Sequence, residues 1–229
     1  MKHISLITIF FLGFMAQAQA PIGFYLSGGV TQTSLKSDDL LADPGMGFKI
    51  GSIFNMGYHQ SYNYQVEVFF GLGSLDLLAV DENYESKENS KYAYSTTDIG
   101  FYFNYYIIKP EEGKFYMGPQ IGTTFTFAPQ LTETESTNNE YYLPHLMSDG
   151  ELMTLPDINY SAGFGLTGGY NDFRFDLRYS LGLNNMLRDF QTNSYNQNGL
   201  YTGPSAEGKI NTISFTVSYS VWKLMGVAE

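Results

Sequence analysis

The sequence contains no cysteine, few charged residues and few basic ones. Without cysteine, neither a disulfide framework nor a thiolate metal site can form in its 229 residues. Charged residues make up only 15%, and 12 Lys and Arg stand against 23 Asp and Glu, for a net charge of -11. Because binding to nucleic acid requires clustered basic side chains, nucleic acid is not an expected partner. Beyond the first segment, no apolar run reaches the ~18 residues of a transmembrane helix.

Aromatic residues and glycine are abundant instead. The chain has 19 Tyr, 18 Phe and 24 Gly. Tyrosine and phenylalanine favour β-strands, and they form the interfacial girdles of barrels that span a membrane. The composition therefore favours an all-β protein.

Residues 1–18 have the pattern of a secretory signal peptide. Lys2 supplies the positive charge, residues 4–15 the apolar run, and Ala16-Gln17-Ala18 the small-x-small cleavage site. Cleavage after Ala20 is the alternative, but it would place Pro21 directly behind the cut. The prediction is export, followed by one domain over residues 19–229.

Within the stretch 173–185, residues 173–183 alternate strictly between apolar and polar positions. Phe173, Phe175 and Leu177 lie on one face, and Arg174, Asp176 and Arg178 lie on the other. A period of two indicates a β-strand with two unlike faces. Seven further stretches repeat this alternation: 22–31, 46–56, 62–73, 97–108, 115–127, 158–170 and 213–222. Pro119 cannot donate a hydrogen bond to a strand ladder, so a bulge or local break is expected there.

Short and long connections alternate between these stretches. The short ones are 58–60, 109–113 and 171–172, and the long ones are 32–45, 74–96, 128–157 and 184–212. This order predicts an eight-stranded antiparallel up-and-down transmembrane β-barrel with short periplasmic turns and long extracellular loops. Whether loop 128–157 carries additional strands is left open by its sequence.

The volume of the apolar face decides which face points outward. An eight-stranded barrel has an interior just wide enough to be filled by side chains. The many Phe, Tyr, Leu, Ile and Val side chains of the apolar face exceed that space, whereas the Gly-, Ser- and Thr-rich face fits it. The apolar face is therefore expected to contact lipid, in a bacterial outer membrane.

Six charged residues fall on the inward face. These residues are Lys49, Glu67, Asp98, Arg174, Asp176 and Arg178. A charge in a narrow interior is costly unless it is paired. Three positive and three negative charges predict an interlocked network that plugs the lumen. The alternative is the selectivity filter of a narrow pore.

The sequence DLRY at residues 176–179, followed by GLNN at 182–185, resembles the penultimate-strand signature of the PorT-like outer-membrane β-barrel family. The Gly-rich stretch 162–170 extends this resemblance. It implies an outer-membrane barrel, and one branch of that family takes part in a secretion apparatus. The resemblance implies no catalytic residues. The chain departs from the usual pattern by continuing past Trp222, which is expected in an interfacial aromatic belt.

Two histidines, His59 and His145, remain after the signal peptide. His59 falls in a short turn, and His145 falls in a long loop close to Ser148, Asp149 and Glu151. A lipid A-modifying enzyme resting on His145 is one hypothesis, but spacing within a loop does not fix catalytic geometry. The acidic external loops could bind divalent cations or a basic partner, although solvated loops are the simpler interpretation.

The sequence therefore predicts a non-enzymatic structural or interaction protein with no cofactor and no metal site. Its expected partners are outer-membrane lipid and lipopolysaccharide, together with an envelope protein for which the barrel is an accessory. A monomeric barrel is expected. The alternatives are a narrow small-solute channel and, more remotely, the lipid A-modifying enzyme.

Overall fold

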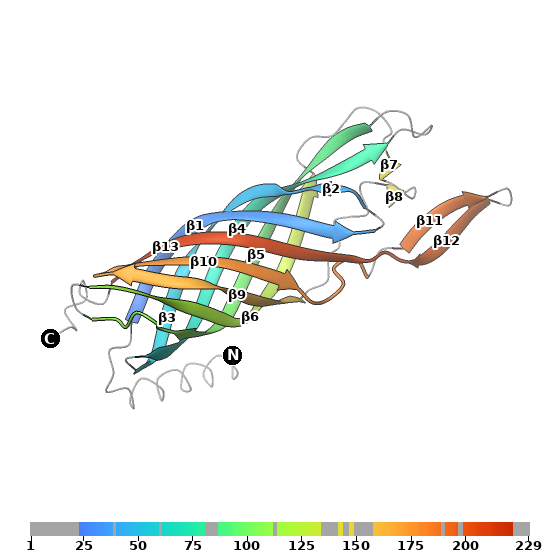
Figure 1. The fold of residues 1–229 in the computed structure, drawn as a ribbon. Coiled ribbons are helices and arrows are strands. Elements are labelled where there is room, and N and C mark those ends of the chain that lie inside the picture. The colour runs from blue at the N-terminus through green and yellow to red at the C-terminus, as the bar shows by residue number, and fades with distance from the viewer. Residues whose placement is uncertain are drawn as a thin grey trace, which may run out of the picture.

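The computed structural model describes residues 23–38, 40–59, 61–80, 87–111, 114–133, 142–143, 147–148, 158–188, 191–196 and 199–221. Eight long strands form a barrel (Figure 1). They are β1 (Gly23–Ser37), β3 (Gly45–His59), β4 (Tyr62–Val80), β5 (Lys87–Tyr105), β6 (Phe115–Glu133), β9 (Ile158–Tyr170), β10 (Phe173–Gly182) and β13 (Gly208–Ser220).

The barrel is closed and has up-and-down topology. Each of these strands pairs antiparallel with the next one along the chain, from β1 through β3, β4, β5, β6, β9 and β10 to β13. Pairing of β13 with β1 completes the ring. The predicted eight-stranded antiparallel barrel is confirmed in the described residues. Closure leaves none of the eight strands with an unpaired edge.

The hairpin between β9 and β10 has the predicted register. Tyr170 pairs with Phe173, and the two-residue turn consists of Asn171 and Asp172. Asn171 has φ 53°, in the left-handed region that tight hairpin turns require and that asparagine tolerates. Arg174, Asp176 and Arg178 therefore share one face of β10 and point into the lumen.

Several strands are longer than the alternation predicted. β1 continues to Ser37, β4 to Val80 and β6 to Glu133, whereas β5 begins at Lys87. β13 likewise begins at Gly208, so all four predicted long loops, 32–45, 74–96, 128–157 and 184–212, were too long. In the extensions of β1, β4 and β5 the apolar side chains occupy the other face of the same strand, so the sequence alternation changes phase there. In β6 a bulge between Phe127 and Gln130 turns Leu131 inward instead.

The break expected at Pro119 lies in only one of the two ladders of β6. β6 pairs with β9 without interruption, with Pro119 opposite Leu166. The ladder with β5 ends at Asn104–Gln120 and resumes one residue out of register at the isolated bridge Ile108–Met117. β5 consequently ends at Tyr105 instead of the predicted residue 108, because proline offers its neighbour no amide hydrogen.

Five short strands occupy the long connections. They are β2 (Ala42–Asp43), β7 (Tyr142–Leu143), β8 (Met147–Ser148), β11 (Gln191–Asn196) and β12 (Gly199–Ser205). β7 and β8 pair with each other, and β7 also pairs with β4, so loop 128–157 does carry strands. β11 and β12 form a separate two-stranded hairpin that projects from the long-loop end (Figure 1).

The barrel consists of two zones with opposite polarity. In the belt zone, exemplified by residues 62–72 of β4, large apolar side chains point outward; Phe70 is 59% exposed and Leu72 is 52% exposed. In the distal zone, toward the long loops, apolar side chains point inward, and Leu75 and Leu77 of the same strand are fully buried. The pleat is continuous, so the same face changes from polar to apolar along one strand.

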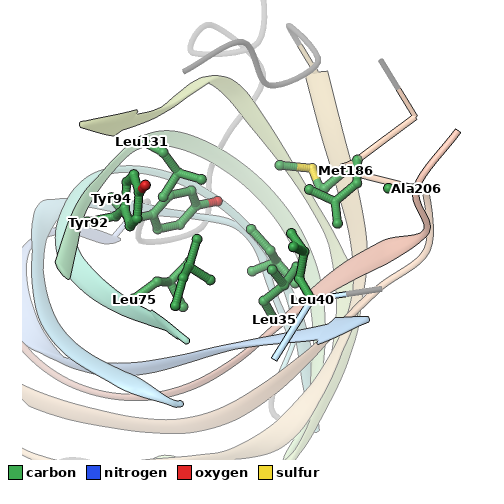
Figure 2. Close-up of a cluster of buried hydrophobic side chains, with 11 residues drawn as sticks. Leu35, Leu40, Leu75, Tyr92, Tyr94, Leu131, Met186 and Ala206 are labelled. Carbon is green, nitrogen blue, oxygen red and sulfur yellow. The ribbon is translucent and has the colours of Figure 1, made fainter. Parts of the chain in front are cut away.

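The inward side chains of the distal zone form the apolar core shown in Figure 2. Its members are Leu35, Leu40, Leu75, Leu77, Tyr92, Tyr94, Leu131, Met186, Leu187, Ala206 and Ile210. The corresponding outward positions are polar, for example Gln32, Lys91 and Gln130. The distal zone therefore has the arrangement of a water-soluble barrel.

Candidate functional site: the barrel lumen

The lumen of the belt zone is filled by a polar network. Its central row comes from β10, where Arg174, Asp176 and Arg178 occupy alternate inward positions. Arg174 is 0% exposed, and Asp176 and Arg178 are almost as deeply buried. Such burial is compatible with charge only where each group has a partner.

Arg174 forms an ion pair with Asp176 on the same strand. The Arg174 Nε donates to both carboxylate oxygens of Asp176, at 3.1 and 3.0 Å, and Nη2 lies 2.9 Å from Oδ1. Nη1 donates to Asn55 Oδ1 at 3.1 Å, and Nη2 also donates to Gln65. A guanidinium offers five N–H donors in a planar fork, and this site satisfies donors on all three nitrogens.

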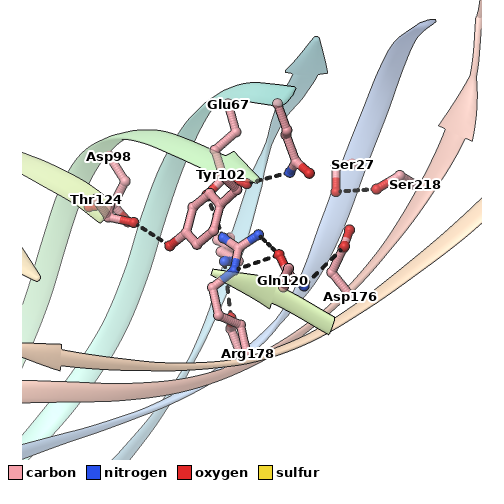
Figure 3. A network of polar contacts seen from close by, with 12 residues as sticks. Ser27, Glu67, Asp98, Tyr102, Gln120, Thr124, Asp176, Arg178 and Ser218 are labelled. Atoms are coloured by element: carbon pink, nitrogen blue, oxygen red, sulfur yellow. Dashed lines mark hydrogen bonds and ion pairs between the residues drawn. The ribbon is translucent and has the colours of Figure 1, made fainter. Parts of the chain in front are cut away.

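Arg178 forms the second ion pair, with Glu67 of β4 on the opposite wall of the barrel (Figure 3). Its Nη2 donates to Gln120 Oε1 at 2.9 Å. The guanidinium carbon also lies 3.6 Å from the centre of the Tyr102 ring, a cation–π contact. Tyr102 is anchored by a 2.6 Å hydrogen bond between its hydroxyl and Thr124.

Amide side chains connect the two ion pairs. Gln120 Nε2 donates to Asp176 Oδ1 at 3.3 Å, and Gln65 Nε2 donates to Glu67 Oε2 at 3.0 Å. Asn104 donates to Gln65 at 3.1 Å and to Asn63 at 2.6 Å. The charge prediction did not include these amides, although their inward register was visible in the alternation. They convert two ion pairs into one network across the lumen.

Glycine makes room for the bulkiest members of this network. A Cβ added to Gly163 would lie 2.5 Å from the Tyr102 hydroxyl, and one added to Gly100 would lie 2.5 Å from Glu67 Oε1. Distances this short are excluded for carbon atoms. The glycine-rich inward face therefore accommodates specific large side chains on neighbouring strands.

Lys49 and Asp98 lie apart from the network that links the other four predicted charges. Lys49 donates to Ser214 Oγ at 3.2 Å, and its ammonium lies 4.6 Å from the centre of the Phe69 ring. Asp98 accepts hydrogen bonds from Thr126 at 2.7 Å and from Thr96 at 3.5 Å. Neither residue forms an ion pair with a described side chain. The six predicted charges therefore do not form one interlocked network. Arg178 pairs with Glu67, and Arg174 pairs with Asp176 on its own strand, so neither acid is left for Lys49.

Lys49 and Asp98 line a small cavity of about 70 Å³. Arg178 and Glu67 border it on the side of the ion pairs, and Tyr94 and Ile210 of the distal core border it on the other. Because one water needs roughly 10–15 Å³ of such space, the cavity can hold on the order of five waters. Asn159 also lines it, and its buried Oδ1 has no hydrogen-bond partner among the described residues.

The short-turn end of the lumen is narrowed by aromatic rings. Tyr106 and Tyr116 meet edge to face, with ring centres 5.4 Å apart. Outside the barrel in the adjacent turn, Lys114 pairs with Glu111, and this hydrogen bond lowers the pKa of Glu111 and raises that of Lys114. From this end to the distal core, the lumen contains an aromatic layer, the ion-pair network, the cavity and the apolar core.

The remaining predicted sites fall largely outside this description. His145, Trp222 and the signal peptide at 1–18 lie outside the described residues, and for His59 only the backbone at the end of β3 is described. Within the described ranges, no group of three or more acidic or histidine side chains could hold a metal ion. In the same part of the chain, no helix is long and apolar enough to cross a membrane.

No model of a known protein family matches the sequence, and no curated protein matches it. Solved structures do resemble it. Ail, the attachment invasion locus protein of Yersinia pestis, was solved with the heparin analogue sucrose octasulfate; it is 12% identical, with coverage of 88% of this chain and 99% of Ail and a TM-score of 0.42.

Two further structures are similar to the same degree. Neisserial surface protein A is 9% identical, with a TM-score of 0.42, and the outer membrane protein OprG of Pseudomonas aeruginosa is 10% identical, with a TM-score of 0.44. Both comparisons cover 86% of this chain and 96% of the other. The resemblance lies in the fold alone. The barrel assignment rests on the strand pairing of this chain itself.

Proposed function

We propose that this protein is an integral β-barrel of the bacterial outer membrane, with the long loops outside. The supporting observation is the apolar outer surface of the belt zone. On β4 the outward apolar side chains extend over residues 62–72, and on β10 and its continuation they extend over residues 173–183. Eleven residues tilted by ~45° span about 25 Å, the height of the apolar band of outer-membrane barrels.

Within that membrane, the protein acts as a non-enzymatic structural or interaction protein with a closed lumen. The ion pairs Arg174–Asp176 and Arg178–Glu67 support closure, because they are satisfied by neighbouring side chains and leave no guanidinium free for a solute. The features left to contact a partner are the distal zone and the projecting hairpin β11–β12. The resemblance of residues 162–185 to PorT-like domains supports a role as an accessory to an envelope secretion or assembly system.

The experiment is a pull-down of the tagged full-length protein from gently solubilised outer membranes, followed by mass spectrometry. A variant lacking residues 191–205 is the matched control, because this hairpin forms its own sheet and pairs with no barrel strand. A stoichiometric envelope protein that is captured by the complete chain and lost from the variant supports the interaction role. A clean monomer in both samples contradicts it.

A narrow small-solute channel is the second candidate, and the polar cavity favours it. The cavity is lined by Lys49, Asp98, Arg178 and Glu67, and these polar side chains could bind a solute on its way through the lumen. Planar-bilayer recordings separate the candidates. A closed lumen predicts no single-channel steps from the wild type, whereas Arg178→Ala, which removes a side chain from the lumen, produces them. Wild-type steps that change with Lys49→Gln would establish the channel instead.

A further inference from the structure

Two lysines face each other on the outer surface of the distal zone. Lys36 of β1 pairs directly with Lys209 of β13, and both side chains are exposed. Like charges directly opposite each other in a sheet are destabilising. An anion bound between the two ammonium groups would offset this repulsion.

The neighbouring acids that the structure describes do not form ion pairs with these lysines. Among the described residues, neither Lys36 nor Lys209 forms an ion pair. Asp38 and Glu207 lie beyond the lysines toward the long loops, so the lysines are nearer to the apolar belt. On the other side of the barrel the ordinary arrangement occurs, with Lys91 directly opposite Asp76.

The lysine pair borders an amphipathic groove of about 710 Å³. Leu41 and Leu183 also line the groove, and they are 57% and 46% exposed. Leu183 continues the outward apolar row of β10 after Leu181, so the apolar belt leads into the groove. The groove therefore joins an apolar wall, continuous with the outward apolar surface of the belt zone, to two lysines that form no ion pair among the described residues. Asp38 and Glu207 line the groove as well, on its long-loop side.

We propose that Lys36 and Lys209 bind the phosphate groups of lipid A, the phosphorylated glycolipid anchor of lipopolysaccharide, with Leu41 and Leu183 contacting its apolar part. This inference rests on the proposed membrane location, with the long loops outside. Ammonium groups form charge-assisted hydrogen bonds with phosphate oxygens, and one phosphate bridging two ammonium groups converts their repulsion into attraction. The acids beyond the lysines confine the anion to the membrane side of the pair.

The first test is titration of lipid A into the purified full-length barrel in a maltoside detergent, with binding followed by native mass spectrometry. Lys36→Gln and Lys209→Gln should each weaken binding about fivefold, and the double variant ~30-fold, since a basic residue near anionic lipid contributes about 1 kcal/mol. Lys91→Gln is the matched control and should bind as the wild type does. Lipid A lacking both phosphates should bind as weakly as intact lipid A binds the double variant.

Equal affinity in the wild type and the double variant would overturn the proposal, as would equal loss from Lys91→Gln or unchanged binding of the dephosphorylated lipid. A second measurement uses the unfolding midpoint in phosphatidylcholine vesicles. Without lipid A, Lys36→Gln should raise the midpoint by removing repulsion; with lipid A, it should lower it. An effect of the same sign in both would also overturn the proposal.

The same vesicles separate this inference from the proposed function. If the wild type does not fold into phosphatidylcholine vesicles, as measured by far-ultraviolet circular dichroism and heat-dependent mobility in electrophoresis, the membrane location itself is wrong. If it folds there but all variants bind lipid A alike, only the lysine site is wrong.

Discussion

The belt zone and the distal zone are built from the same strands but stabilised in opposite ways. On β4, Glu67 is buried in the lumen while Phe70 points outward, whereas eight residues beyond Glu67 the inward Leu75 is completely buried. The belt zone needs an apolar solvent outside and can have a polar interior. On the proposed membrane location, the distal zone has water outside and therefore needs an apolar interior. Because the strand geometry is the same in both zones, the surroundings of each zone decide whether polar or apolar side chains are buried inside the barrel.

The largest effect is expected from breaking the polar interior of the belt zone. Arg178→Ala leaves Glu67 buried without its partner and removes the contact with Tyr102, so the free energy of unfolding should fall by about 3–5 kcal/mol. Urea unfolding in lipid vesicles measures this. The double variant Arg178→Leu with Glu67→Leu should recover most of the loss, and a double variant as unstable as Arg178→Ala would contradict the assignment.

The apolar interior of the distal zone can be tested on one strand. Leu75→Ala removes a fully buried side chain, so stability should fall by about 2–5 kcal/mol. Leu72→Ala, three residues away and 52% exposed, opens no interior cavity and should cost much less in lipid vesicles. Hydrogen exchange of the distal strands should accelerate for Leu75→Ala alone. Equal costs for the two variants would remove the distinction between the zones.

The outer surfaces of the two zones should respond differently to a charge. Phe70→Arg places a charge against the hydrocarbon and should cost about 2–4 kcal/mol in vesicles. Gln130→Arg replaces an exposed polar residue on the distal surface of β6 and should change stability by less than about 0.5 kcal/mol. Similar costs at both positions would show that the bilayer does not end between them.

The smallest effect is expected at the tight turn between β9 and β10. Asn171 has φ 53°, which costs alanine about 1–2 kcal/mol relative to glycine, so Asn171→Ala should lower stability by about 1 kcal/mol and Asn171→Gly should not lower it. Unfolding midpoints of the two variants in the same vesicles test this difference. A lower midpoint for glycine than for alanine would mean that the left-handed turn is not formed.

The sequence determined the closed barrel and the orientation of its faces in the belt zone. Strict alternation at 173–183 and the short pair Asn171-Asp172 are local properties, so strand, register and turn could be predicted from neighbours in the chain. The inward direction of Arg174, Asp176 and Arg178 followed from the same parity.

Only the tertiary structure decided which charges pair and where the barrel changes polarity. Arg178 and Glu67 are separated by 111 positions in the chain, and Arg178 pairs with Glu67 while Lys49 and Asp98 remain apart, because partners are chosen across the lumen. The phase change around Ser74–Leu75 was present in the sequence, but it resembled the end of a strand. The tertiary structure shows that the strand continues into a second zone. There Leu75, Tyr92 and Leu131, from three strands, pack into one core, because an apolar face is stabilised only by apolar groups that contact it.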